Sequence, residues 1–142
     1  MNFRAIITFE DGSAVRLDEN TTIAFDGRDE KIALNMNHGF VYNKVAKNDK
    51  REYFVVTGDY TVMALGTEFS VENENGDINV IVVESVVEIK DKNDKSLEKI
   101  EGGNKATVKS GKIERIKIED VDLENEFVAW NIAKSNNVKV SM

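Results

Sequence analysis

Apolar residues recur at every second position along most of the chain, and this spacing constrains the fold more than any other feature. The recurring residues are rich in Val, Ile, Phe and Tyr, which favour strands. Helical spacing occurs only near the end, where Leu123, Phe127, Trp130 and Ala133 share one face. The sequence therefore predicts an all-β fold, an antiparallel sandwich or rolled, jelly-roll-like sheet with long bent hairpins. A short helix over 123–134 would close one end, the alternative being an irregular strand that ends at Trp130.

Length and composition exclude several classes of protein. The 142 residues are the usual size of one domain, which we expect to span 1–142. The chain has no cysteine and a single histidine, His38, so disulfide scaffolds, thiolate metal sites and cysteine catalysis are excluded. A net charge of −7 disfavours nucleic acids and anionic membranes. No apolar stretch approaches the roughly 18 residues of a membrane span, and no signal-peptide pattern follows Met1.

Turns must rely on Gly, Asn and Asp, because the chain has no proline. A charged run from Asp91 to Lys99 is interpreted as a long exposed loop. The predicted turns are Asp11-Gly12, Asp26-Gly27, Asn37-His38-Gly39, Asn75-Gly76, Gly102-Gly103 and Ser110-Gly111.

The Asn75-Gly76 turn predicts a long hairpin in one register. This dipeptide favours a two-residue type I′ turn, which places Glu74 opposite Asp77. A slip by one residue would pair apolar with polar positions. A straight ribbon of this length would span about 40 Å, so we expect it to bend at Gly66 and Ser85 and pass from one sheet to the other. The predicted pairs are Val71/Val80, Phe69/Val82 and Leu65/Val86 on one face, and Val62/Ile89, Ala64/Val87 and Gly66/Ser85 on the other.

A second hairpin is predicted at Asp11-Gly12. The same two-residue geometry places Ile6 opposite Leu17 and Thr8 opposite Val15.

Several segments resemble the FecR domain family, in that family's order. The most specific is Leu65-Gly66-Thr67-Glu68-Phe69-Ser70-Val71, which is similar to its "LGT-x-F-x-V" block. Weaker matches span Asp11 to Val108. They are Asp11-Gly12-Ser13 with Val15-Arg16-Leu17, Gly39-Phe40-Val41-Tyr42 with Val45-Ala46-Lys47, Phe54 to Gly58, Glu84-Ser85-Val86-Val87-Glu88 and Glu101 to Ala106. Ser85 stands where the family usually has glycine.

The resemblance implies a non-catalytic extracytoplasmic sensory domain that contacts a protein partner in the cell envelope, without a cofactor. The family's transmembrane regulators pass a signal from an outer-membrane transporter to a sigma factor. The membrane span would lie in the parent chain, of which this chain would be an excised domain, the alternative being a stand-alone relative. The motif positions are Asp11, Gly12, Ser13, Gly58, Leu65, Gly66, Thr67, Phe69, Val71, Asn75, Gly76 and Ser85.

Candidate chemical groups have simpler structural interpretations. His38 lies in a turn context without a matched nucleophile, and no nucleophile elbow surrounds a serine. Gly66-Thr67 lacks a phosphate-loop pattern. Phe127 and Trp130 are interpreted as a core plug. Three acidic segments could supply calcium ligands, but a hairpin turn, a solvated loop and a helix start explain them: Glu72–Asp77, Asp91–Lys95 and Glu119–Glu124.

The leading hypothesis is a module that binds a protein partner through a sheet edge or the face near the C-terminal end. The rival is a cell-surface or wall-associated structural domain that binds glycan or ions through acidic side chains. A cytosolic enzyme is a third hypothesis, but the sequence shows no matching constellation of acid and base.

Overall fold

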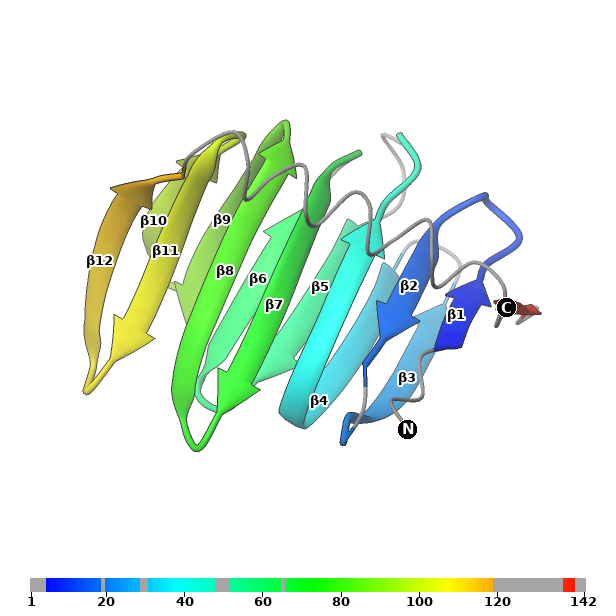
Figure 1. The fold of residues 1–142 in the computed structure, drawn as a ribbon, viewed down its shortest axis with the longest axis horizontal. Coiled ribbons are helices and arrows are strands. Elements are labelled where there is room, and N and C mark those ends of the chain that lie inside the picture. The colour runs from blue at the N-terminus through cyan, green and yellow to red at the C-terminus, as the bar shows by residue number, and fades with distance from the viewer. Residues whose placement is uncertain are drawn as a thin grey trace.

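Two β-sheets pack face to face in this chain (Figure 1). The computed structural model describes residues 5–18, 20–28, 31–47, 52–64, 66–118 and 137–139, and these residues form thirteen strands and no helix. The strands are β1 (Ala5–Thr8), β2 (Ala14–Leu17), β3 (Thr22–Arg28), β4 (Lys31–Lys44), β5 (Glu52–Thr57), β6 (Tyr60–Ala64), β7 (Glu68–Glu74), β8 (Asp77–Glu84), β9 (Val86–Asp91), β10 (Ser96–Glu101), β11 (Asn104–Lys109), β12 (Lys112–Lys117) and β13 (Asn137–Lys139).

One long strand belongs to both sheets. The first part of β4 pairs with β3 and β5, and its second part pairs with β7 and β2. The front sheet of Figure 1 therefore has the order β12-β11-β8-β7-β4-β2-β1-β13, and the back sheet the order β10-β9-β6-β5-β4-β3. The predicted all-β rolled sheet is confirmed. The sheet is not wholly antiparallel, because β4 with β5 and β1 with β13 pair in parallel.

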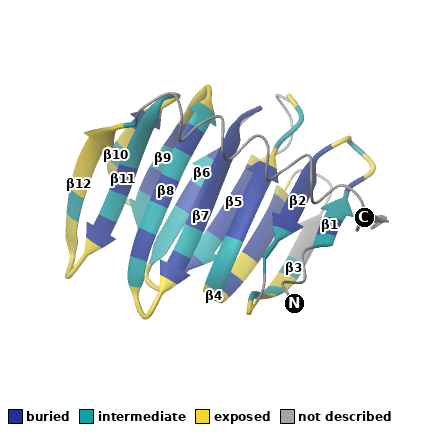
Figure 2. Cartoon of the chain, in the orientation of Figure 1, coloured by how far each residue is buried: buried dark blue, intermediate teal, exposed yellow. Residues whose placement is uncertain are grey.

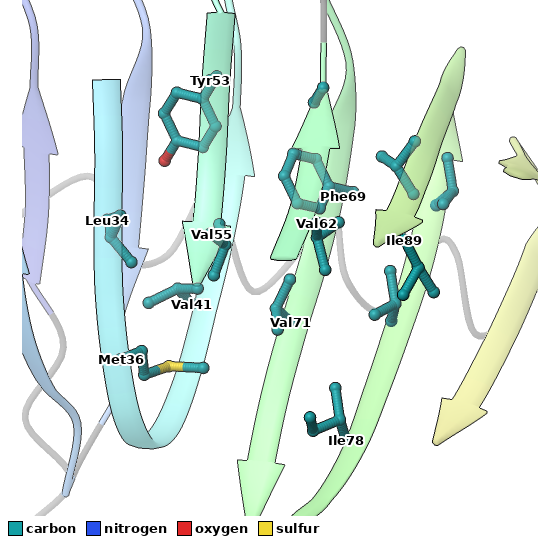
Figure 3. Close-up of a cluster of buried hydrophobic side chains, with 14 of the residues drawn as sticks. Leu34, Met36, Val41, Tyr53, Val55, Val62, Phe69, Val71, Ile78 and Ile89 are labelled. Atoms are coloured by element: carbon teal, nitrogen blue, oxygen red, sulfur yellow. The ribbon is translucent and has the colours of Figure 1, made fainter. Parts of the chain in front are cut away.

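The core lies between the sheets and consists mainly of Val and Ile, with three buried aromatic rings, of which Figure 3 shows Tyr53 and Phe69. The rings of Tyr53 and Phe69 meet edge to face, with their centroids 6.2 Å apart. Burying each large aliphatic side chain contributes about 1.5–3 kcal/mol. The shared dry layer is thus what holds the two sheets together.

Three passages from one sheet to the other change which residues point inward: the one within β4, the one from β6 to β7 and the one from β8 to β9. In β4 the core residues are Ile32, Leu34 and Met36 before the crossing and Val41 after it. The even-to-odd change recurs from Val62 and Ala64 to Phe69 and Val71, and from Val80 and Val82 to Val87 and Ile89. A positive φ occurs at each crossing, at Gly39 (+121°), Gly66 (+60°) and Ser85 (+70°). These residues reset the strand alternation, so the same dry layer is lined on both sides.

The long hairpin is confirmed in its register. Glu74 lies opposite Asp77, and Asn75 and Gly76 have φ of +54° and +93°, as a type I′ turn requires. The predicted pairs Val71/Val80, Phe69/Val82, Val62/Ile89 and Ala64/Val87 are all present, with a bulge between Glu68 and Phe69. The assignment of these pairs to opposite faces was wrong, because the crossings turn all of them toward one core. Leu65 lies outside the described residues.

The predicted register of the first hairpin was wrong by one residue. Ile7 lies opposite Val15, and Ile6 opposite Arg16. Backbone bonds between Phe9 and Ser13 (2.7 Å) and from the Gly12 N–H to the Phe9 carbonyl (3.0 Å) close a three-residue loop. Such a loop places its last residue in a left-handed conformation, as Gly12 shows with φ +92°.

Glycine-rich dipeptides marked some turns correctly and others wrongly. Gly102-Gly103 and Ser110-Gly111 connect strands as predicted. Asp26-Gly27 lies inside β3, and Asn37-His38-Gly39 lies inside β4, where the strand bends without reversing. Most of the run from Asp91 to Lys99 is not a loop, because β10 begins at Ser96 and a short turn precedes it. The predicted helix over 123–134 lies outside the described residues.

We expect Gly39→Ala to lower the free energy of unfolding by more than about 3 kcal/mol. A Cβ at this position would lie 2.7 Å from the Thr21 Cα, at a φ that side chains rarely adopt. Gly58→Ala is the control: its φ is +58°, but its Cβ would have no atom nearer than 4.0 Å. It should cost only about 1–2 kcal/mol. Urea unfolding measures both variants, and equal losses would contradict the crowding argument.

Candidate functional site

The residues of the predicted motif do not meet at one point of the structure. Phe69 and Val71 lie in the core, and Thr67 is buried at the crossing beside Gly66. The other described motif residues lie in turns or at crossings: Gly58, Asn75, Gly76 and Ser85. The described motif residues shape the backbone or pack in the core, and they bring no set of reactive groups together.

The Asp11-Gly12-Ser13 turn ties the first hairpin to the chain beyond β4. Asp11 Oδ1 accepts a hydrogen bond from the Ser13 N–H (2.8 Å), and Ser13 Oγ accepts one from the Ala46 N–H (2.9 Å). Ser13 is fully buried. Its hydroxyl therefore satisfies a backbone donor that strand pairing leaves open.

A charged side chain is buried on the outer face of the front sheet. Arg16 is 2% exposed, and its Nε lies 2.9 Å from Asp18 Oδ1. Its guanidinium carbon lies 5.0 Å from the Phe40 ring centroid and 5.4 Å from that of Tyr42. The Tyr42 hydroxyl donates a hydrogen bond to Glu68, which is also buried. We call Arg16, Asp18, Phe40, Tyr42 and Glu68 the arginine cluster.

The arginine cluster follows from strand pairing but was not predicted. Arg16 lies opposite Tyr42 on the neighbouring strand, and Tyr42 lies opposite Ser70. The only sign of the arginine cluster in the sequence is an arginine between Val15 and Leu17. The same pattern is equally typical of an exposed position in an alternating strand. Its charges are engaged with one another and with aromatic faces, so its chemistry is that of a structural ion pair.

Two polar contacts join the back sheet to the front sheet through the core. The Tyr53 hydroxyl donates to Asn43 Oδ1 (2.5 Å), and Asn73 Nδ2 donates to Thr57 Oγ1 (2.7 Å). Burial, and to a smaller extent the Asp11 carboxylate, raises the pKa of Tyr53 well above its ordinary value. The hydroxyl therefore stays protonated and holds the two sheets in one alignment.

The described candidate ligands for ions bond within a turn or across a pair of strands. Asp91 Oδ1 accepts bonds from the N–H groups of Asn93 (2.8 Å) and Lys95 (3.0 Å), and Glu72 accepts one from Asn79 Nδ2 (3.1 Å). Within the described residues no three His, Asp or Glu side chains are grouped to hold a metal ion. The Glu119–Glu124 segment, Phe127 and Trp130 lie outside the described residues.

The hollows of the described surface include two shallow ones. One of about 200 Å³ on the outer face of the back sheet is lined by Met63, Val86, Val87, Glu88 and Lys99. The other, of about 180 Å³ beside the bend of β4, includes His38, Phe40, Glu72 and Glu74. His38 is exposed there and does not reverse the chain. Neither hollow contains a residue of the predicted motif.

The strand edges differ in how well they are protected against pairing with another chain. At one side of the sandwich, β12 is largely exposed and carries Lys112 and Lys117 at its ends (Figure 2). Arg115 of β12 pairs with Glu98 (3.6 Å) and Glu101 of β10, which joins the edges of the two sheets. β10 also has a bulge between Ser96 and Glu98. Charge and bulges are the usual protection of edges.

The opposite edge of the back sheet is different. Among the described strands β3 pairs with β4 alone, so one side of its backbone has no described strand beside it. Its first four residues, Thr22 to Phe25, carry no charge. Phe25 packs against Phe9 with their ring centroids 5.3 Å apart, which anchors the strand to the core. β3, with seven residues, is therefore less protected against pairing than the edge strands β10 and β12.

Comparison with known proteins identifies relatives of this fold. The family model described as FecR protein matches residues 2–88. No match is found among curated proteins. In the part of the chain that the structure describes, no helix has the length and apolar content to span a bilayer.

Two similar solved structures, at 1.65 Å and 2.50 Å resolution, are each of a protein from Parabacteroides distasonis ATCC 8503 that is provisionally described as an anti-sigma factor. The first has a TM-score of 0.73 at 19% identity and covers 92% of this chain. The second has a TM-score of 0.64 at 18% identity and covers 84%. This chain spans 64% and 61% of their lengths, and the likeness shows a shared fold.

Arg16→Ala should lower the free energy of unfolding by about 3 kcal/mol, because it opens the aromatic stack and leaves the Asp18 charge without this partner. Arg115→Ala is the control, since that arginine also pairs with carboxylates but is 40% exposed. It should cost about 1 kcal/mol or less. Chemical unfolding measures both, and a loss at Arg16 no larger than at Arg115 would contradict a structural role for the arginine cluster.

Tyr53→Phe should lower the free energy of unfolding at pH 7 by about 1–2 kcal/mol, because Asn43 loses a buried donor. Above the ordinary tyrosine pKa of 10.0, the unfolded chain releases the Tyr53 proton while the folded chain keeps it. Stability of the unsubstituted chain should therefore fall with rising pH, by about 1.4 kcal/mol per pH unit from this group. The deficit of the variant should shrink accordingly.

Denaturant unfolding at pH 7 and pH 11 tests this expectation. Tyr60→Phe, at a half-buried position of the same sheet, should keep the alkaline loss of stability. A Tyr53→Phe deficit of the same size at both pH values would be evidence against the buried, protonated hydroxyl.

Proposed function

The chain belongs to the FecR family, and from this premise we propose that it is a regulatory domain of sigma and anti-sigma signalling that acts by binding a protein partner. The family match is the observation that carries the proposal. It extends over residues 2–88, and so includes the three crossings at Gly39, Gly66 and Ser85. The provisional description of the two similar structures agrees with it.

The geometry supports binding as the mode of action. Several buried polar side chains bond to one another across strands or between sheets, as Tyr42 with Glu68, Tyr53 with Asn43 and Asn73 with Thr57 do. What the domain offers to other molecules is a set of sheet faces and strand edges. Backbone groups along an edge can pair with a strand of another protein, which provides affinity without a deep pocket.

We further propose that the domain is non-catalytic and works outside the cytoplasm, in a parent protein that crosses the membrane. It would receive an envelope signal by protein contact and pass it toward a sigma factor. In this proposal no cofactor takes part. The motif residues, from Asp11 to Ser85, stabilise the fold and do not form a reaction site.

In-frame removal of the codons for residues 5–118 from the native gene should change transcription several-fold at the promoters of one sigma factor. Other promoters should be unaffected, because an anti-sigma regulator controls a single factor. Sequencing of total RNA measures this. Gly58→Ala in the same gene is the control that should leave transcription as it was. Unchanged transcripts after the deletion, together with retention of the chain on isolated cell-wall material, would instead support the wall-associated alternative.

A further inference from the structure

We propose that the open side of β3 is the docking site for a basic, extended segment of the partner protein, which adds to the back sheet as a further strand. The proposal rests on the proposed function, since it names the surface and the kind of partner for that binding. It follows from the open backbone of β3, the protection of the other long edges and the distribution of charge.

The backbone of β3 is prepared for another strand. In an antiparallel pair, residues alternate between those that bond to the neighbouring strand and those whose N–H and C=O point away from it. β3 pairs with β4 from Ile23 to Arg28 without interruption, and the only irregularity lies between Thr22 and Ile23. Every second residue of β3 therefore directs a donor and an acceptor toward the open side.

Two side chains of β3 hold the strand firmly. Ile23 and Phe25 pack against the core, which keeps the strand straight and in register. Ala24, between them, is exposed and small. A partner strand can approach without displacing a long side chain at this position.

Charge selects a basic partner. Asp18 is paired with Arg16. Residues 19–30, which comprise β3 and the chain on either side of it, contain four further carboxylates and one arginine, a net charge of −3 out of −7 for the whole chain. The residues of β12, at the far side of the molecule, carry a net charge of +2. An approaching basic strand is thus attracted to β3 and repelled from the edge at β12.

Amide hydrogen exchange with a synthetic probe tests the proposal. The probe is an octapeptide that alternates lysine and valine, and its controls replace lysine with glutamate or valine with proline. The basic peptide should slow exchange at residues 23–28 in a saturable manner. The acidic peptide should lack charge attraction, and the proline peptide should lack the strand hydrogen bonds, so neither should protect β3.

A matched pair of variants separates this edge from the others. Ala24→Lys adds a charge and a long side chain to β3 and should weaken peptide binding about tenfold or more. Ser96→Lys makes the same change of charge on β10 and should leave binding unchanged. If Ala24→Lys fails to fold, as thermal unfolding would reveal, Thr22→Lys at the start of β3 takes its place.

Protection confined to β10 or β12, equal effects of the two lysine variants, or equal protection by the acidic peptide would overturn the assignment to β3. None of these results would contradict the proposed regulatory role, because the transcription experiment tests that role separately. Growth in mass of the unliganded chain with concentration, abolished by Ala24→Lys, would make a second copy the occupant of β3 and would also overturn the proposal.

Discussion

The dry layer between the two sheets is the interaction on which the rest of the structure depends. It can form only if the chain crosses between sheets and still turns its apolar residues inward. At three of the crossings the inward-facing positions change from even to odd numbers. A positive φ at Gly39, Gly66 and Ser85 corrects the alternation, and the close approach of Thr21 to Gly39 leaves no room for a side chain there. The backbone conformation of a few residues is therefore a condition for burial of the whole core.

Most of the fold could be predicted from the sequence where one strong local signal set the geometry. Asn75-Gly76 requires a two-residue turn, and the register of Val71 with Val80 and of Val62 with Ile89 follows from it. Glycine alone does not distinguish a reversal from a bend within a strand, which is why the turn at Asn37–Gly39 was wrong. A change between even and odd apolar positions does not distinguish them either, because it also accompanies the two-residue reversal at Asn75-Gly76, from Val71 to Val80.

The candidate site was less predictable because it depends on contacts between distant segments. Whether Arg16 is buried is decided by its neighbours on other strands, Tyr42 and Glu68, and not by its own surroundings in the sequence. The same holds for an edge. Period-two alternation identifies β3 as a strand, but only the completed order of strands shows that β4 is its single described neighbour. Local patterns could not identify the class of protein, and the family resemblance did. The positions that carry this resemblance lie mostly in the core, in turns or at crossings between the sheets.

The participation of β4 in both sheets has a mechanical consequence. In most sandwiches the two layers are connected by loops, and relative sliding is opposed mainly by side-chain packing. Here one uninterrupted strand, β4 (Lys31–Lys44), pairs with β3 in the back sheet and with β7 in the front sheet. Tension applied to the back layer is therefore carried to the front layer along covalent bonds, with the Tyr53–Asn43 contact acting as a brace. Relative sliding of the two layers is therefore opposed by the backbone of β4 as well as by side-chain packing.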